Sequence, residues 1–100
     1  MIVQLAAEGA LVQEADDYGS LHLRTDLDAD GVRTALRTTG TGELVDDGSA
    51  WLDLGVLRAN AQLAATSPDW AQRWAEMIAE AERKGLLSED GRAVRVAIER

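Results

Sequence analysis

Apolar residues recur with a helical period between positions 67 and 84, and this is the strongest pattern in the sequence. Trp70, Trp74 and Met77 are spaced so that they share one face of an α-helix. Ser67 stands where an N-cap residue is expected, directly before a proline that suits the first helical turn. We therefore predict an amphipathic helix over residues 67–84, whose bulky apolar face must cover another surface.

Two further segments are predicted to be helical. Residues 28–39 carry apolar side chains at helical spacing, and Asp28 occupies the N-cap position. Residues 55–65 alternate apolar and polar positions, which taken alone indicates a strand. The content of Ala, Leu, Arg and Gln in this segment favours a helix instead, and we predict a helix.

Two β-hairpins are predicted on either side of the helix at 28–39. Residues 10–15 and 20–26 have strand-like patterns, and the Asp-Asp-Tyr-Gly stretch between them has the composition of a turn. We therefore predict a hairpin over residues 10–25. Residues 43–54 hold two short apolar stretches around an Asp-Gly pair, which predicts a second hairpin.

The two ends of the sequence complete the predicted sheet. Val94, Val96 and Ile98 alternate with other residues, which predicts a strand over residues 92–99. Residues 1–9 are apolar and weakly patterned, and they fit either an edge strand or a brief helix that ends at a glycine.

Together these elements predict a single α+β domain over residues 1–100. We expect an antiparallel-rich sheet of four to six strands, packed on one face by two or three helices. From residue 20 onward the element order approximates β-α-β-β-α-β, so a ferredoxin-like arrangement is the leading topology.

Composition and charge limit the classes of function. The chain has no cysteine, and its formal net charge is −8 at pH 7. The lack of cysteine excludes disulfides and cysteine-based metal sites, and it fits a cytoplasmic protein. The acidic charge disfavours nucleic-acid binding, because phosphate backbones are repelled. No stretch approaches the roughly 18 apolar residues of a membrane span, and no basic signal region begins the sequence, so we expect a soluble protein with no membrane partner.

A short acidic motif precedes the first predicted helix. Asp26, Asp28 and Asp30 alternate and are followed by Gly31, as in the opening of an EF-hand calcium loop. Arg37 occupies the position at which that loop requires a bidentate glutamate. We interpret the motif as a strand-to-helix junction capped by aspartate, and we expect no bound metal and no other cofactor.

Three side chains near the predicted hairpin over residues 10–25 are candidate ligand or interface residues. His22 is the only histidine, and alternation places it on the same strand face as Arg24. A histidine of ordinary pKa can act as a general base, but the sequence places no nucleophile beside this one. Tyr18 is predicted at a hairpin tip, where an exposed aromatic can serve in recognition. This pattern favours a non-catalytic protein over an enzyme.

The apolar helix face suggests the leading hypothesis for function. Trp70, Trp74 and Met77 offer more apolar surface than a thin, alanine-rich sheet is expected to cover. We therefore expect a non-catalytic interaction or assembly module that forms a homodimer and can also bind a protein partner.

Two alternative hypotheses remain open at this point. In one, a small-ligand-binding protein or small enzyme has a pocket between the sheet and the tryptophan-bearing helix, with Tyr18, His22 and Arg24 supplying polarity. In the other, a helix that ends in Gly-Leu and runs into a hairpin resembles winged-helix DNA-binding domains, with Arg33 and Arg37 on the recognition helix.

Overall fold

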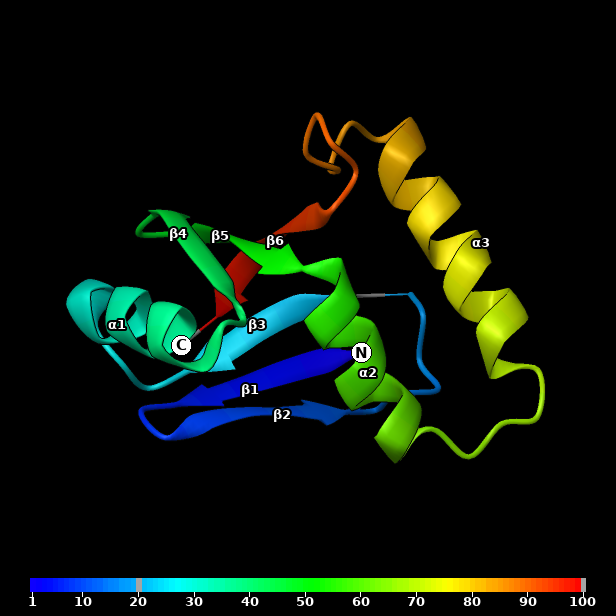
Figure 1. Cartoon of the computed structure of the whole chain (residues 1–100), viewed down its shortest axis with the longest axis horizontal. Helices are drawn as coiled ribbons and strands as arrows, with labels where there is room; N and C mark the ends of the chain where they lie inside the picture. Colours follow the sequence, from blue (N-terminus) through cyan, green and yellow to red (C-terminus); the bar gives the residue numbers. More distant parts are fainter. Residues whose placement is uncertain (20, 100) are drawn as a thin grey trace.

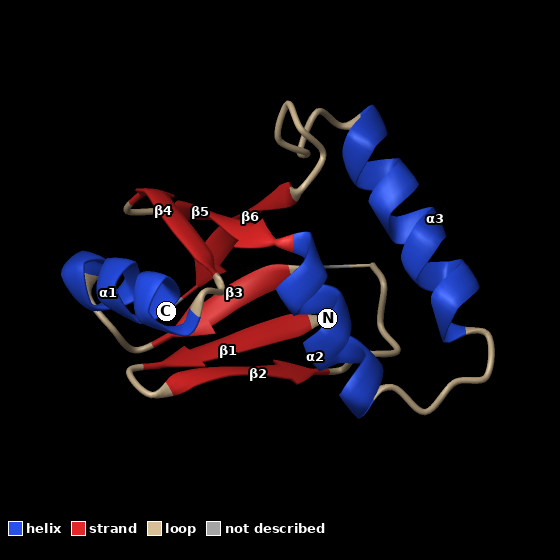
Figure 2. Ribbon diagram, viewed as in Figure 1, coloured by secondary structure: helices blue, strands red, loops and turns tan. Residues whose placement is uncertain are grey.

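The computed structural model describes residues 1–19 and 21–99, which form one six-stranded sheet and three helices. The helices lie on one side of the sheet and leave its other face open (Figure 1). Figure 2 shows the same arrangement by secondary structure, and the predicted α+β class is confirmed. In chain order the elements are β1 (Ile2–Ala6), β2 (Gly9–Gln13), β3 (His22–Thr25), α1 (Ala29–Thr39), β4 (Gly42–Asp46), β5 (Ser49–Asp53), α2 (Leu54–Ala64), α3 (Trp70–Arg83) and β6 (Ala93–Glu99).

The core lies between the sheet and the helices. Alternate side chains of each inner strand point toward the helices, so Val3 and Leu5 of β1 and Leu23 of β3 are buried. The helices meet this layer with one apolar face each. The buried apolar cluster consists of Met1, Val3, Leu5, Leu23, Val32, Ala35, Leu36, Ala50, Leu52, Leu57, Ala61, Trp70, Trp74, Val94 and Val96.

The hairpin predicted over residues 10–25 is wrong. β2 and β3 are not neighbours, because β1 lies between them, antiparallel to β2 and parallel to β3. Ala7 and Glu8 form a two-residue turn that joins β1 to β2. This tight turn closes a hairpin at a lower entropic cost than the longer loop that leads to β3. The N-terminal segment is thus an interior strand, and Ser20 of the predicted second strand lies outside the described residues.

The hairpin predicted over residues 43–54 is confirmed by the pairing of β4 with β5. In its turn the backbone N–H of Gly48 donates a hydrogen bond of 2.8 Å to the carboxylate of Asp46. At the other end of the hairpin, a Cβ atom on Gly42 would lie only 1.9 Å from the carbonyl oxygen of Trp51. The two backbones can approach this closely only because residue 42 has no side chain.

The strands follow the order β2-β1-β3-β6-β5-β4 and form a mixed sheet with both parallel and antiparallel pairs. This order differs from the ferredoxin-like arrangement that was the leading predicted topology. In a ferredoxin-like domain one helix precedes the last strand, which lies at an edge beside the first. Here two helices, α2 and α3, connect β5 to β6. When one helix connects two strands of a sheet, the second strand runs parallel to the first. The additional helix reverses the direction of the chain once more before it enters β6. β6 therefore runs antiparallel to β5 and parallel to β3, and it lies between them.

Aspartate caps set the N-terminal ends of α1 and α2. Both helices fall within one residue of the predicted ranges 28–39 and 55–65. Asp28 is the N-cap of α1, as predicted, and its carboxylate accepts a hydrogen bond of 2.8 Å from the backbone N–H of Gly31. Asp53 caps α2 in the same way.

α3 begins at Trp70, later than the predicted start at Ser67. The N-cap is Asp69, whose side chain makes no capping hydrogen bond. In the segment before the helix, the carboxylate of Asp16 accepts hydrogen bonds of 3.2 Å from the backbone N–H groups of Thr66 and Ser67. The backbone N–H of Trp70 bonds to the carbonyl oxygen of Ser67 at 3.3 Å, so the residues directly before Trp70 form a turn that leads into the helix.

Candidate functional site

The two tryptophans of α3 are buried inside the chain. Trp70 and Trp74 are 4% and 5% exposed, and their rings stack with centroids 5.4 Å apart. The indole N–H of Trp70 donates a hydrogen bond of 3.0 Å to the carbonyl oxygen of Ala15. Both rings are thus covered by residues of the same chain, and neither presents the open apolar surface from which the homodimer was expected.

Asp16 ties the segment between β2 and β3 to the segment that precedes α3. Its carboxylate accepts hydrogen bonds from the backbone and hydroxyl of Thr66 and from the backbone of Ser67, at 3.0 to 3.2 Å. Desolvation raises the pKa of Asp16, but these hydrogen bonds outweigh it, and the pKa lies below its ordinary value. Together with the bond from Trp70 to Ala15, this contact fixes the N-terminal end of α3.

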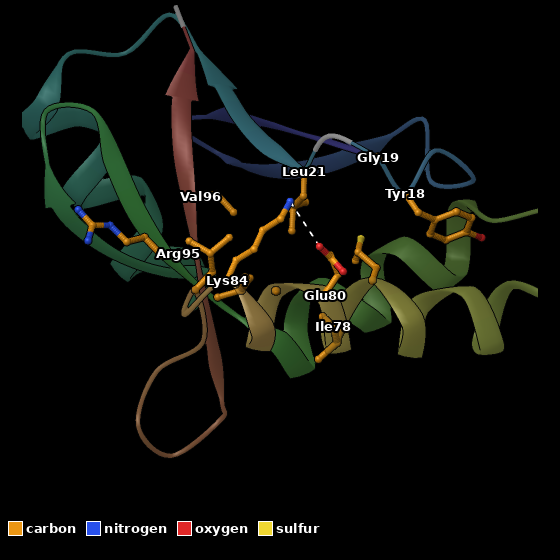
Figure 3. Close-up of a pocket in the computed structure, with 12 residues that line it drawn as sticks. Tyr18, Gly19, Leu21, Ile78, Glu80, Lys84, Arg95 and Val96 are labelled. Atoms are coloured by element: carbon orange, nitrogen blue, oxygen red, sulfur yellow. Dashed lines mark ion pairs between the residues drawn. The ribbon is translucent and has the colours of Figure 1, made fainter.

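A groove of about 300 Å³ runs between α3 on one side and β6 and the segment before β3 on the other (Figure 3). We call it the α3 groove. Tyr18 lies toward one end of it, and Lys84, the C-cap residue of α3, extends over it (Figure 3). Its apolar lining consists of Leu21, Met77, Ile78, Ala81, Leu86, Val94 and Val96.

Tyr18 contributes an aromatic wall to the α3 groove. Its hydroxyl oxygen is buried and has no hydrogen-bond partner among the described residues. Burial raises the pKa of Tyr18 above its ordinary value of 10.0, and the negative charges of Asp16 and Asp69 add to the increase. The side chain is therefore neutral at physiological pH and acts in the groove as an apolar ring.

The rim of the α3 groove carries a small cluster of charges. Glu80 forms an ion pair with Lys84, whose Nζ lies 3.9 Å from the carboxylate (Figure 3). Glu80 also accepts a hydrogen bond from the guanidinium of Arg83. That hydrogen bond and the charges of Arg83 and Lys84 lower the pKa of Glu80. Of the charged side chains that line the groove, Lys84 and Arg95 are cations and Glu80 is a carboxylate, so the lining has a net positive charge in a protein whose total is −8.

His22 and Arg24 lie on the open face of the sheet, away from the α3 groove. The predicted alternation is confirmed, since Leu23 between them is fully buried in the core. The Nε2 atom of His22 lies 3.3 Å from the carboxylate of Glu99. The strand register places Ile2 and Ala97 beside His22, and neither aliphatic residue is a nucleophile that the imidazole could activate. Thus His22 and Arg24 do not join Tyr18 around one cavity.

The acidic motif before α1 is committed to local contacts. Asp28 caps the helix, and Asp30 forms an ion pair of 2.8 Å with Arg33. Among residues 1–19 and 21–99, no group of three or more His, Asp or Glu side chains is arranged to hold a metal ion.

β2 forms one edge of the sheet and carries no charged residue. Leu11 in its centre is 70% exposed, and the register pairs it with Gln4, so its side chain lies on the open face. Leu63 of α2 is 88% exposed. A hollow of about 200 Å³ adjoins both leucines, and we call this surface the β2 edge. It is lined by Ala10, Leu11, Val12, Asn60, Leu63 and Ala64.

β4, the strand at the opposite edge, has the features that protect an edge from pairing with another chain. Glu43 and Asp46 place carboxylates on it, and the register shifts between Leu44 and Asp46, as at a β-bulge. Charges and bulges on an edge strand discourage the addition of a further strand. The two edges of the sheet therefore differ in their readiness to pair.

Leu11 and Leu63 were not among the residues selected from the sequence. One signal was available, because residues 9–13 contain no charge although they lie between Glu8 and Glu14. A second was that Leu63 does not share the apolar helix face formed by Leu57 and Ala61. Neither signal identifies an edge without the strand order.

Comparison with known proteins does not assign a function. No protein-family model matches the chain, and neither the curated proteins nor the solved structures include a match. Within the described part of the chain, no helix is long and apolar enough to span a membrane.

Proposed function

We propose that this chain is a non-catalytic assembly module that forms a homodimer by pairing the β2 strands of two copies. The observation that carries this proposal is an uncharged edge strand accompanied by two exposed leucines, Leu11 and Leu63. The unpaired backbone groups of an edge strand are a template for another strand. The leucines supply the apolar burial that such pairing needs to be stable in water.

A two-fold axis through the β2 edge gives the simplest such dimer. Two β2 strands related by this axis run antiparallel, and the six strands of each copy then continue into one sheet. Leu11 of each copy approaches its counterpart on the open face. On the helix side, Leu63 of one copy lies near the hollow of the other, which Ala10, Val12 and Ala64 line.

The distribution of charge supports pairing at this edge. Two copies with a net charge of −8 repel each other, so an uncharged strip is the favourable place for contact. The carboxylates of Glu8 and Glu14 lie just beyond the two ends of β2. Antiparallel pairing brings Glu8 of one copy toward Glu14 of the other, so screening by salt should strengthen the dimer.

Light scattering coupled to size-exclusion chromatography tests the proposal. At about 100 μM, well above the dissociation constant that a specific interface provides, we expect a mass twice that of the 10.8 kDa chain. Leu63→Asp places a carboxylate in the interface and should give the monomer. Val45→Asp is the matched control, because Val45 is a 40% exposed apolar residue on the other edge strand.

Two results would contradict the proposal. One is a wild-type protein that stays monomeric at this concentration. The other is a dimer that resists Leu63→Asp but dissociates in Val45→Asp, which would place the interface at β4. Circular dichroism of both variants verifies that each is folded.

A further inference from the structure

We infer that the α3 groove binds a small amphiphilic carboxylate, with its alkyl chain in the groove and its head group at Lys84. The site uses none of the residues of the β2 edge, so the inference does not depend on the dimer. It concerns a ligand and not the assembly of two copies.

The first support is the uneven cover of the apolar face of α3. In the N-terminal half of the helix, Trp70 and Trp74 are almost fully buried by this chain. In the C-terminal half, Met77 and Ala81 lie on the same face but are only partly buried, and they line the groove. Half of the apolar face is thus covered internally, and the other half borders a concave space. A volume of about 300 Å³ is at the lower end for small-molecule sites.

The second support is the position of Lys84, the only lysine of the chain. Figure 3 shows its side chain reaching across the groove, with Nζ toward Leu21 and Glu80. The separation of 3.9 Å from Glu80 is too long for a hydrogen bond. Glu80 already accepts a hydrogen bond from Arg83. The ammonium of Lys84 therefore retains donors that an incoming anion can use.

These two features together select the class of ligand. An apolar groove with a positive rim complements a molecule that has one alkyl chain and one negative charge. A single ammonium is a compact point charge and matches a monoanion such as a carboxylate. The ring of Tyr18 lies toward the end of the groove opposite the backbone of Lys84 (Figure 3). Because this ring bounds the groove, a short or medium alkyl chain fits better than a long one.

Isothermal titration with octanoate, octan-1-ol and octylammonium tests this assignment on the wild-type chain. We expect saturable binding in the order octanoate, octan-1-ol, octylammonium, because the chain is constant and only the head group changes. In a parallel NMR titration, octanoate should shift the methyl signals of Leu21, Met77 and Val96, which line the groove. Failure of octanoate to saturate, or equal binding of octylammonium, would overturn the inference.

Substitutions separate the head-group contact from the groove itself. Lys84→Gln should weaken octanoate about twofold to fivefold, the effect of losing one largely exposed ion pair, and leave octan-1-ol unchanged. Ala81→Leu fills the groove and should weaken both ligands. Arg58→Gln removes an exposed positive charge on α2, at a residue that does not line the groove, and should change neither. If Arg58→Gln weakens octanoate as much as Lys84→Gln does, the binding is a general charge effect and the site assignment is wrong.

Discussion

The indole N–H of Trp70 donates a hydrogen bond of 3.0 Å to the carbonyl oxygen of Ala15, a residue 55 positions earlier in the sequence. This bond is buried, and it joins α3 to the segment between β2 and β3. Trp70 therefore does two things at once: its ring fills the core beside Trp74, and its N–H holds the helix at one point.

The first prediction concerns this bond. Trp70→Phe keeps an aromatic ring but removes the donor, which leaves the carbonyl oxygen of Ala15 without its partner. We expect the free energy of unfolding to fall by about 1–3 kcal/mol, the cost of an unsatisfied buried polar group together with lost packing. Urea denaturation followed by circular dichroism measures it. Trp51→Phe, at a half-buried residue outside the core cluster, should cost less. Equal losses in the two variants would contradict this expectation.

The second prediction concerns pH. The pKa of Asp16 lies below its ordinary value of 3.8, so the unfolded chain binds a proton there more readily than the folded chain. The stabilisation from its ionised form is present above the ordinary pKa and disappears as the pH falls through the folded-state value. Asp16→Asn should therefore be less stable than wild type near neutral pH, and the difference should shrink below about pH 4.

Urea denaturation of both proteins at a series of pH values measures this difference. Other carboxylates with lowered pKa, among them Asp46 and Glu80, make both proteins less stable in acid. The difference between the two proteins isolates the contribution of Asp16. A difference that is constant across the acid range would contradict the assigned direction of its pKa.

The third prediction concerns the close approach of β4 and β5. A methyl group at residue 42 would overlap the carbonyl oxygen of Trp51, so Gly42→Ala must push the two backbones apart. We expect a loss of about 1–3 kcal/mol in the free energy of unfolding, as for other overpacked sites. Gly48→Ala is the control, because the nearest atom to its added Cβ is a side-chain oxygen of Asp46 at 3.7 Å. If both alanines cost the same, the close approach of the strands is not what requires glycine.

The fourth prediction concerns Tyr18, the only tyrosine of the chain. Its phenolate absorbance reports on one residue, and the midpoint of the titration should lie above pH 10.0. Burial and the charges of Asp16 and Asp69 disfavour the anion, so folding opposes deprotonation. The corresponding stability is present below the ordinary pKa and is lost as the pH rises through the folded-state value. Asp69→Asn removes one of the charges and should lower the midpoint, whereas a wild-type midpoint at or below 10.0 contradicts the burial of the hydroxyl.

Elements with strong local signals could be predicted from the sequence. Asp28 begins α1 and an Asp-Gly turn joins β4 to β5, because caps and tight turns depend on a few adjacent residues. The pairing of β1 with both β2 and β3 could not be predicted in the same way. Several strands of similar pattern compete for each partner, and the choice depends on the whole sheet. The hydrogen bond between Thr66 and Asp16 could not be predicted for the same reason, since it joins residues 50 positions apart.

The candidate sites were less predictable than the fold. The prediction that Trp70 and Met77 share an apolar face of α3 is correct. The periodic pattern does not indicate, however, that Trp70 is covered by the rest of the chain while Met77 borders a groove. Likewise, Leu11 and Leu63 lie near each other only because α2 packs beside β2. Exposure is a property of neighbouring elements, and a single sequence gives the periodicity of each element without its neighbours.

The central position of β6 has a consequence for how the chain reaches its native state. β6 is the last strand in the sequence, yet it joins β3 on one side to β5 on the other. Until residues 93–99 are in place, the strands β2-β1-β3 and β5-β4 are two separate sheets, each with an open interior edge. During synthesis on the ribosome β6 therefore emerges after the other five strands, although it joins the two parts of the sheet. Folding of the complete sheet must wait for contacts between distant parts of the chain.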